Sequence, residues 1–315
     1  MSYHSMSISN PQDLSNTIWA AATLDIPPPA TWMELFEIES RGRLSAFTSQ
    51  GLGNMIWGFA KLRHSPSNEW LQTFVVASLA NIPNFNAQDM SNIVWALAEL
   101  DVNPGSEWME AWTKRLMILL NVLSEQVTAN ALWALTVLQE YRNTAFLMLW
   151  SRSQQLLTPA SDVRGLHNIY CVYKASTAEM PELLPEPDAT NFDAARDAWR
   201  NNTADRAKQD ASNIAAAVAA CLRNMSIVHK IEYLWFASER SIDIALPDRR
   251  IAIEVDGPSH YLGNTRKPSG TTQLRDRVLK RAGWAVVSVP WFEWVELSST
   301  QAQMDYLQRK LATCK

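Results

Sequence analysis

The sequence predicts two parts: an α-solenoid of helical hairpin repeats over residues 1–228, and a small α/β domain over residues 229–315. Two observations carry this prediction. Tryptophan recurs every 38 residues through the first half of the chain, and short strand-like runs alternate with helical patterns from residue 231 onward. The chain has 315 residues, 47% of them hydrophobic, which is enough for a large core.

Four sequence positions share a period of 38 residues, which is too regular for composition bias and indicates an internal repeat. The residues at these positions are Trp19, Trp57, Trp95 and Trp133; Trp32, Trp70 and Trp108, with Phe146 at the next step; Gln12, Gln50, Gln88 and Gln126; and Asn16, Asn54, Asn92, Asn130 and Asn168. We expect the repeat to be recognisable in the fold as one structural unit per period.

Each unit reads as a helical hairpin. A helix such as "LSNTIWAAATL" from Leu14 is followed by a turn rich in Pro or Gly, and a second helix begins near Trp32. One hairpin cannot bury its own apolar face, but stacked hairpins can. The predicted repeat cores lie near 12–48, 50–86, 88–124 and 126–162. Residues 164–228 read as a degenerate continuation, with an exposed linker near 180–191 and a last repeat-like helix start at Asn213.

The repeats resemble the octotricopeptide repeat family. The stretches that carry the resemblance are "PPPATWM", "SPSNEWL", "NPGSEWM" and "MSNIVWALAEL", and it covers about residues 11–175. It implies sequence-selective binding of organellar RNA, and hence a place in the mitochondrion or chloroplast. The first ten residues are Ser-rich but contain no arginine, so we do not expect them to act as a transit peptide.

A polar stripe on the first helix of each hairpin is the candidate RNA-reading surface. In the first repeat it comprises positions 13, 16, 20 and 23, and its recurrent amide predicts RNA contacts from Asn16, Asn54, Asn92, Asn130 and Asn168. An amide can donate to and accept from a base edge. The alternative is that the asparagines brace adjacent hairpins. We interpret the Trp19 series as core filling rather than a stacking platform, and the Gln12 series as an aid to helix initiation.

The C-terminal region has the pattern of a mixed sheet covered by helices. Strands are expected over 241–246, 251–255 and 284–289, and helices over 271–282 and 299–313, with a loop over 263–270. This order of strands and helices predicts a small α/β domain.

This region resembles the RAP domain. The carrying stretches are "IAIEVDGPSHY" from Ile251, "LRDRVLKRAGW" from Leu274 and "VVSVPWFEW" from Val286, and the resemblance covers nearly all of residues 231–295. It implies RNA binding in organelles, in proteins where the domain often follows an array of helical repeats.

The same core is similar to the restriction-endonuclease-like, PD-(D/E)XK fold. The similarity implies that Asp243 and Glu254 are metal-binding carboxylates, with Asp256 at the position of the usual lysine and His260 in the following loop. Such carboxylates suit Mg²⁺. Because the lysine is absent, two interpretations remain: a slow nuclease, in which Lys280 or His260 substitutes, and a degenerate site in which the acidic residues and His260 form a polar network. We favour the second.

Positive charge is concentrated at the C-terminal end. The formal net charge is −4, whereas residues 229–315 hold 13 basic against 10 acidic residues. The densest basic cluster is predicted to contact RNA phosphates and comprises Arg266, Lys267, Arg275, Arg277, Lys280 and Arg281. The alternative is a helix face that only meets solvent.

Three functions follow from these patterns. The first is an RNA-binding protein that stabilises, processes or promotes translation of organellar mRNA or rRNA. The second is a structural component of a ribonucleoprotein such as an organellar ribosome, which the acidic repeat region favours. The third is a metal-dependent ribonuclease. The expected partner is single-stranded RNA, with ribonucleoprotein components besides. Binding needs no cofactor, Mg²⁺ enters only for a nuclease, and no membrane partner is expected because long uncharged apolar runs are absent.

Overall fold

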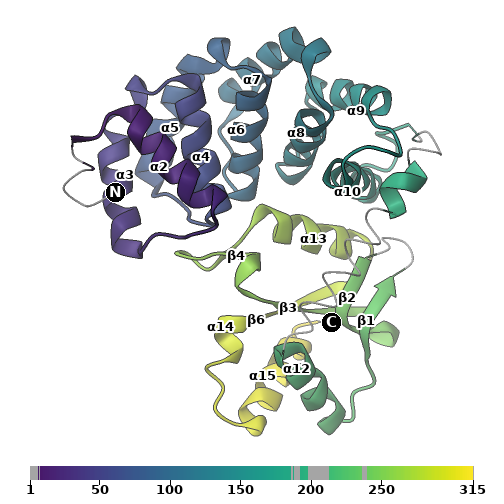
Figure 1. Ribbon diagram of the computed structural model, residues 1–315. Coiled ribbons are helices and arrows are strands. Elements are labelled where there is room, and N and C mark those ends of the chain that lie inside the picture. Colours follow the sequence, from purple (N-terminus) through teal and green to yellow (C-terminus); the bar gives the residue numbers. More distant parts are fainter. Residues whose placement is uncertain are drawn as a thin grey trace.

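The computed structural model describes residues 6, 8–185, 187, 192–197, 213–235 and 240–314. Its N-terminal region is mostly helical, and its C-terminal region is a small α/β domain with a mixed sheet (Figure 1). Both features agree with the sequence prediction. None of the helices in the described ranges is both long and apolar enough to cross a membrane.

The N-terminal region is built from helical hairpins in two layers. The first helices of the hairpins pack on one another in succession, and they are α2 (Pro11–Thr23), α4 (Ser49–Lys61), α6 (Ala87–Glu99), α8 (Glu125–Val137) and α10 (Val163–Glu179). The second helices form the other layer, and they are α3 (Ala30–Arg41), α5 (Asn68–Asn81), α7 (Ser106–Leu119) and α9 (Thr144–Leu156). Short 3₁₀ turns follow the second helices at Leu44–Ala46, Ile82–Asn84 and Leu120–Val122.

Side-chain caps open the first helices at the same place in each repeat. The cap residues are 38 residues apart, each accepts a hydrogen bond from a backbone N–H of the first turn, and they are Asn10, Thr48, Asn86, Ser124 and Asp162. These bonds satisfy N–H groups that have no partner inside the helix. The cap residue therefore initiates each first helix, whereas the Gln12 series, which was predicted to have this role, lies two residues further on.

The ends of the first helices also repeat. The residues that leave α2, α4, α6 and α8 adopt the left-handed conformation, with φ between 53° and 60°, and they are Asp25, Arg63, Asp101 and Gln139. A residue in this conformation allows backbone N–H groups beyond the helix to donate hydrogen bonds to its last carbonyl groups. Because the four residues differ in type, the sequence pattern did not reveal it.

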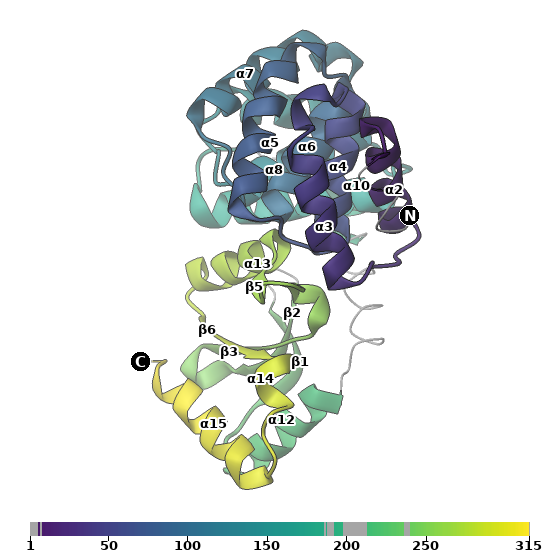
Figure 2. The same cartoon turned by 90° about the vertical axis from the view of Figure 1, so that its left-hand side faces the viewer.

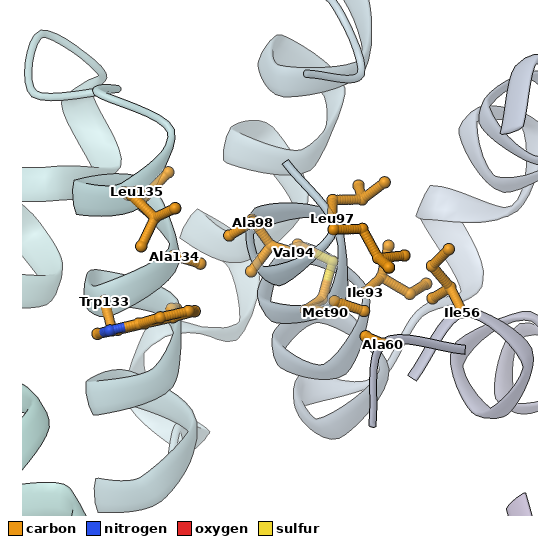
Figure 3. Close-up of a cluster of buried hydrophobic side chains, with 14 of the residues drawn as sticks. Ile56, Ala60, Met90, Ile93, Val94, Leu97, Ala98, Trp133, Ala134 and Leu135 are labelled. Carbon is orange, nitrogen blue, oxygen red and sulfur yellow. The ribbon is translucent and has the colours of Figure 1, made fainter. Parts of the chain in front are cut away.

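The core of the repeats lies between the two layers and between successive first helices. Figure 3 shows Ile56 and Ala60 of α4 beside Met90 and Ile93 of α6, all of them buried. In the second-helix layer, the Trp70 indole N–H donates to Ser40 Oγ at 2.9 Å. Trp108 repeats this bond with Ser78 at 3.0 Å, so adjacent hairpins are joined in the same way.

The C-terminal domain contains a four-stranded sheet in the order β1-β2-β3-β6. The strands β1 (Lys230–Trp235), β2 (Arg240–Leu246) and β3 (Ile251–Asp256) are antiparallel, and β6 (Ala285–Pro290) is parallel to β3. A short hairpin of β4 (Tyr261–Leu262) and β5 (Lys267–Pro268) follows β3, with 3₁₀ turns at Pro247–Arg249 and Pro258–His260.

Helices cover both faces of this sheet. On one face, α12 (Asn213–Asn224) and α15 (Thr300–Ala312) bury Leu222 and Leu307 against Ile253. On the other face, α13 (Gly270–Arg281) buries Leu279 beside Trp284. The short α14 (Trp291–Trp294) directly follows β6.

The boundary between the two parts differs from the prediction. We placed residue 213 onward in the repeats, up to residue 228, but α12 packs on α15 and β2 of the α/β domain. The cause is its apolar face, where Val218 and Leu222 are fully buried in the α/β core. The domain boundary therefore lies before residue 213. Part of the linker predicted near 180–191 lies outside the described residues.

Candidate functional site

The repeated Gln, Asn and Trp residues lie on one stripe of the first helices. In α4, the side chains that reach the surface after the first residue are Gln50, Asn54, Trp57 and Lys61, whereas the positions between them are buried. Their spacing of four, three and four residues places them on one helix face. In α6 the same positions hold Gln88, Asn92, Trp95 and Glu99, which are also at least partly exposed. We call this surface the Gln–Asn–Trp stripe.

The tryptophans of the stripe are not uniform core residues. Trp19 is 46% exposed and Trp57 and Trp95 are half-buried, while Trp133 is only 5% exposed. The rings of Trp95 and Trp133 lie 6.3 Å apart. The interpretation of this series as core filling is therefore wrong for Trp19, whereas Trp95 is partly exposed and also packs against the apolar core. The predicted stripe was rotated by one residue, because its positions 13 and 20 correspond to buried residues in α4 and α6.

The asparagines occupy the middle of the stripe. Asn16 is exposed, and the other four are partly buried. Asn168 Nδ2 donates to Asn130 Oδ1 at 3.0 Å, which joins α10 to α8. Gln88 Nε2 donates to Asn92 Oδ1 at 2.7 Å within α6. The series thus has a bracing role at one repeat junction while its side chains remain within reach of a ligand.

The α/β domain docks on the C-terminal ends of the first helices, with α13 lying against α6, α8 and α10 (Figures 1 and 2). The β4–β5 hairpin reaches the turn that follows α4, where the Gly263 N–H donates to the Arg63 carbonyl at 2.7 Å. Asn264 exchanges two hydrogen bonds with the backbone of Ser65, at 2.9 and 2.7 Å. Thr271 Oγ1 donates to Glu99 at 2.8 Å.

The docked helix approaches the repeats without room for a side chain at its start. A Cβ atom added to Gly270 would lie 2.1 Å from the Ala98 carbonyl oxygen. Leu262 and Leu274 continue the contact by joining the apolar core of the repeats. The two parts of the chain therefore share a tight interface that combines hydrogen bonds with apolar contacts.

Arg277 is part of this interface. Its guanidinium donates to the carbonyl oxygens of Thr136 and Val137, at 2.8 and 2.9 Å, and to Glu179 Oε1 at 2.9 Å. It thereby caps the C-terminal end of α8, where carbonyl groups lack partners and the helix dipole is negative. Arg277 was predicted to contact RNA phosphates, but Glu179 and the carbonyl groups at the end of α8 engage its N–H groups.

Arg275 faces the opposite way, into the sheet. Its side chain is 3% exposed, and its guanidinium lies 2.7 Å from Asp256 Oδ1, 3.2 Å from Glu254 Oε2 and 2.7 Å from Asp276 Oδ1. Burial disfavours its charge, but the carboxylates outweigh burial and raise its pKa further. Burial alone would raise the pKa of Asp256, and Arg275 lowers it instead. Arg275 was predicted to contact phosphate, but it is buried as an internal counter-ion.

The carboxylates implied by the nuclease resemblance do not fit a resident Mg²⁺. Glu254 and Asp256 face the Arg275 guanidinium, which occupies the place of a cation. Burial raises the pKa of Asp243 to about 6, and its Oδ2 accepts the Val255 N–H at 2.7 Å. Within the described ranges no group of three or more His, Cys, Asp or Glu residues is arranged to hold a metal.

Four residues of the predicted basic cluster remain exposed. Lys280 and Arg281 lie at the end of α13, and Arg266 and Lys267 lie in the β4–β5 hairpin. Arg266 lies over the Phe292 ring, with Cζ 4.7 Å from the ring centroid. No sequence pattern indicates this pairing, because the two residues are far apart along the chain. His260 is nearby, with a 35% exposed side chain and Nδ1 3.3 Å from Asp256 Oδ1.

Comparisons with known proteins agree with this division of the chain. Residues 253–310 match the family model of the RAP domain, and residues 4–145 match that of the Tbc2 translation factor, N-terminal domain. A stretch of 71 residues, 22% of the chain, is 39% identical to the RAP domain-containing protein, chloroplastic, of Oryza sativa subsp. japonica, and covers 11% of that protein. A stretch of 63 residues, 20% of the chain, is 36% identical to human FAST kinase domain-containing protein 3, mitochondrial, and covers 10% of it.

The chain thus matches about a tenth of the length of these relatives, which are chloroplastic and mitochondrial proteins. The region matched by the family model contains β6, α13 and most of β3 and α15. The C-terminal part of this chain, residues 253–310, is a RAP domain.

Proposed function

We propose that the chain is an RNA-binding protein of organelle gene expression that holds single-stranded RNA along the Gln–Asn–Trp stripe. The observation that carries the proposal is the recurrence, in each of the first three hairpins, of an exposed or half-buried Trp beside an amide. An aromatic ring stacks on any base, at about 1–3 kcal/mol per base, and an amide can read a base edge. Because the Trp and amide side chains recur at a regular spacing, they suit a polymer of similar nucleotides such as RNA.

The comparisons support the location. The relatives are chloroplastic and mitochondrial, and the N-terminal match is to a domain described as that of a translation factor. We assign the repeats to the octotricopeptide type on their 38-residue period and on stretches such as "MSNIVWALAEL". Stabilisation, processing and translation of a target mRNA or rRNA are the roles that fit such a binder.

We assign the α/β domain to the PD-(D/E)XK type on its parallel β3–β6 pair, with Glu254 and Asp256 near the end of β3. A nuclease function is not supported, because Arg275 is paired with both carboxylates and no lysine stands at position 256. The domain is better suited to binding than to hydrolysis.

A structural role in a ribonucleoprotein is the second candidate. Residues 1–180 hold 15 acidic against 10 basic residues, and acidic surfaces repel RNA while suiting basic protein partners. Crosslinking followed by RNA sequencing separates the two functions. Crosslinks to a single mRNA would support a free regulator. Crosslinks to rRNA, with the protein migrating together with ribosomes in a gradient, would support the structural role.

RNA affinity tests the proposal directly. Fluorescence anisotropy with a labelled single-stranded RNA pool compares the unmodified chain with Trp57→Ala/Trp95→Ala, for which we expect at least a tenfold rise in Kd because two stacking surfaces are removed. Val76→Ala is the control, since Val76 is 71% exposed on the second-helix layer. Equal affinity of the double variant, with an intact fold, would contradict the proposal.

A further inference from the structure

A group of aromatic and basic side chains surrounds one edge of the sheet in the RAP domain. The parallel strands β3 and β6 end together there, with Asp256 paired to Pro290 in register. The 3₁₀ turn and the β4–β5 hairpin continue from β3, and α14 continues from β6. The carboxyl ends of parallel strands are where open α/β sheets bind their ligands.

Arg266 and Phe292 form the centre of this group. The guanidinium lies over the Phe292 ring, and Tyr261 contacts the same ring at a centroid distance of 5.1 Å. Arg266 is exposed and Phe292 is half-buried, as is Trp291, whose ring lies 6.0 Å from that of Phe292. A guanidinium that rests on an aromatic ring offers a flat outer surface for a base and N–H groups for a phosphate.

The hairpin that carries Arg266 is held in place by the repeats. Arg266 has a φ of 56°, in the left-handed region that a residue with a side chain adopts at a cost. Gly263 and Asn264 of the same hairpin are hydrogen-bonded to Arg63 and Ser65, just beyond α4. Lys61, the last stripe residue of α4, lies two residues before Arg63. The stripe and the hairpin therefore meet at the end of α4.

The charges below this group favour binding without hydrolysis. Arg275 is fixed in the core of the domain and pairs with the Glu254 and Asp256 carboxylates, so that its one positive charge offsets part of their two negative charges. Attraction for phosphate then comes from the outer residues, Arg266 and Lys267, both exposed. His260 lies beside Asp256 and is partly open to solvent.

We propose that this edge of the RAP domain is a second RNA site, which binds one nucleotide of a single strand by stacking on Arg266 and pairing its phosphate with Arg266 and Lys267. This inference rests on the proposed function, since the strand is the one held by the stripe. It adds that the domain binds the RNA where the strand leaves α4. It also assigns a binding role to the edge of the sheet that carries Glu254 and Asp256.

Binding across a salt series tests the site with the full chain and a 5′-labelled, mixed-sequence 20-nucleotide RNA. For Arg266→Ala/Lys267→Ala we expect Kd to rise roughly tenfold, and the log–log salt dependence to flatten by about 0.7 for each phosphate that the variant no longer binds. Arg266→Lys keeps the charge but removes the planar surface, so it should keep the salt slope and still bind more weakly. Arg309→Ala, an exposed arginine on α15, is the matched control and should change neither quantity.

Crosslinking supplies a second readout. RNA containing 4-thiouridine, irradiated on the unmodified chain, should label peptides that contain Arg266–Lys267 or Trp291–Phe292, and Phe292→Leu should abolish the label at an unchanged melting temperature. If the hairpin variants bind like the unmodified chain and no label maps to this edge, the inference is overturned. Weakened binding by Trp57→Ala/Trp95→Ala in the same assay would then leave the proposed function standing, whereas unchanged binding by all variants would remove both.

Discussion

The repeats and the RAP domain differ in how the position of a residue relates to its task. In the repeats, one position performs one task in successive units: Asn86 and Ser124 both cap a first helix, and Trp70 and Trp108 both bond a serine of the preceding hairpin. In the RAP domain, two arginines two residues apart on α13 perform different tasks. Arg275 pairs with the sheet carboxylates and Arg277 caps a helix of the repeats.

This difference shows when sequence clustering is informative. A recurrent position reports a shared environment, because each repeat meets its neighbours in the same way. A run of basic residues indicates only proximity along the chain, since side chains two residues apart on a helix point to different sides and meet different partners. The following experiments test whether α13 connects the two parts as described, and whether the repeats are equivalent.

The largest effect is expected for Arg275. Replacing it with leucine leaves Glu254 and Asp256 buried without their counter-ion, which costs about 3–5 kcal/mol of unfolding free energy. Urea denaturation followed by circular dichroism measures this decrease. Arg275→Lys keeps one charge and should recover part of it. Equal stability of Arg275→Leu and the unmodified chain would mean that the carboxylates are not held by this ion pair.

Gly270 tests the docking of α13 on the repeats. Gly270→Ala places a Cβ 2.1 Å from the Ala98 carbonyl oxygen, so the interface has to move apart at a cost of about 2 kcal/mol. Limited proteolysis between the two parts should accelerate. The control is Gly257→Ala, where no atom lies within 4 Å of the added Cβ and φ is −71°. Similar behaviour of both variants would argue that the two parts do not dock closely.

Arg277 and Arg281 form a matched pair on the same helix. Arg277→Ala removes three charge-assisted hydrogen bonds, and we expect the unfolding free energy to fall by about 2 kcal/mol. Arg281 is exposed, so Arg281→Ala should change stability by less than about 0.5 kcal/mol. If RNA affinity fell for Arg277→Ala at unchanged stability, the residue would contact RNA, as its place in the basic cluster predicts.

Much of the fold could be predicted from the sequence, and the site only in part. The 38-residue period and the alternating runs after residue 240 indicate the helical region and the mixed sheet, because they reflect local packing. The side on which Trp19 lies was misjudged because one residue turns about 100° around a helix axis, which is enough to move a position from the buried to the exposed side. The pairing of Arg275 with Asp256 and of Arg266 with Phe292 depends on the folded sheet, so no local pattern indicates it.

The N-terminal caps provide the smallest expected effect and test the equivalence of the repeats. Asn86 Oδ1 accepts the Asp89 N–H at 2.9 Å, and the Asp89 carboxylate accepts the Asn86 N–H at 3.1 Å. Asn86→Ala removes the first of these bonds and should cost about 1 kcal/mol, with a similar cost for Ser124→Ala one repeat later. Gln88→Ala serves as the control, since Gln88 is exposed in the same turn and its side chain donates to Asn92 rather than to the backbone. Similar decreases at the two caps, measured by urea denaturation, would support one environment per repeat. A large decrease at one cap and none at the other would show that the shared position does not have a shared task.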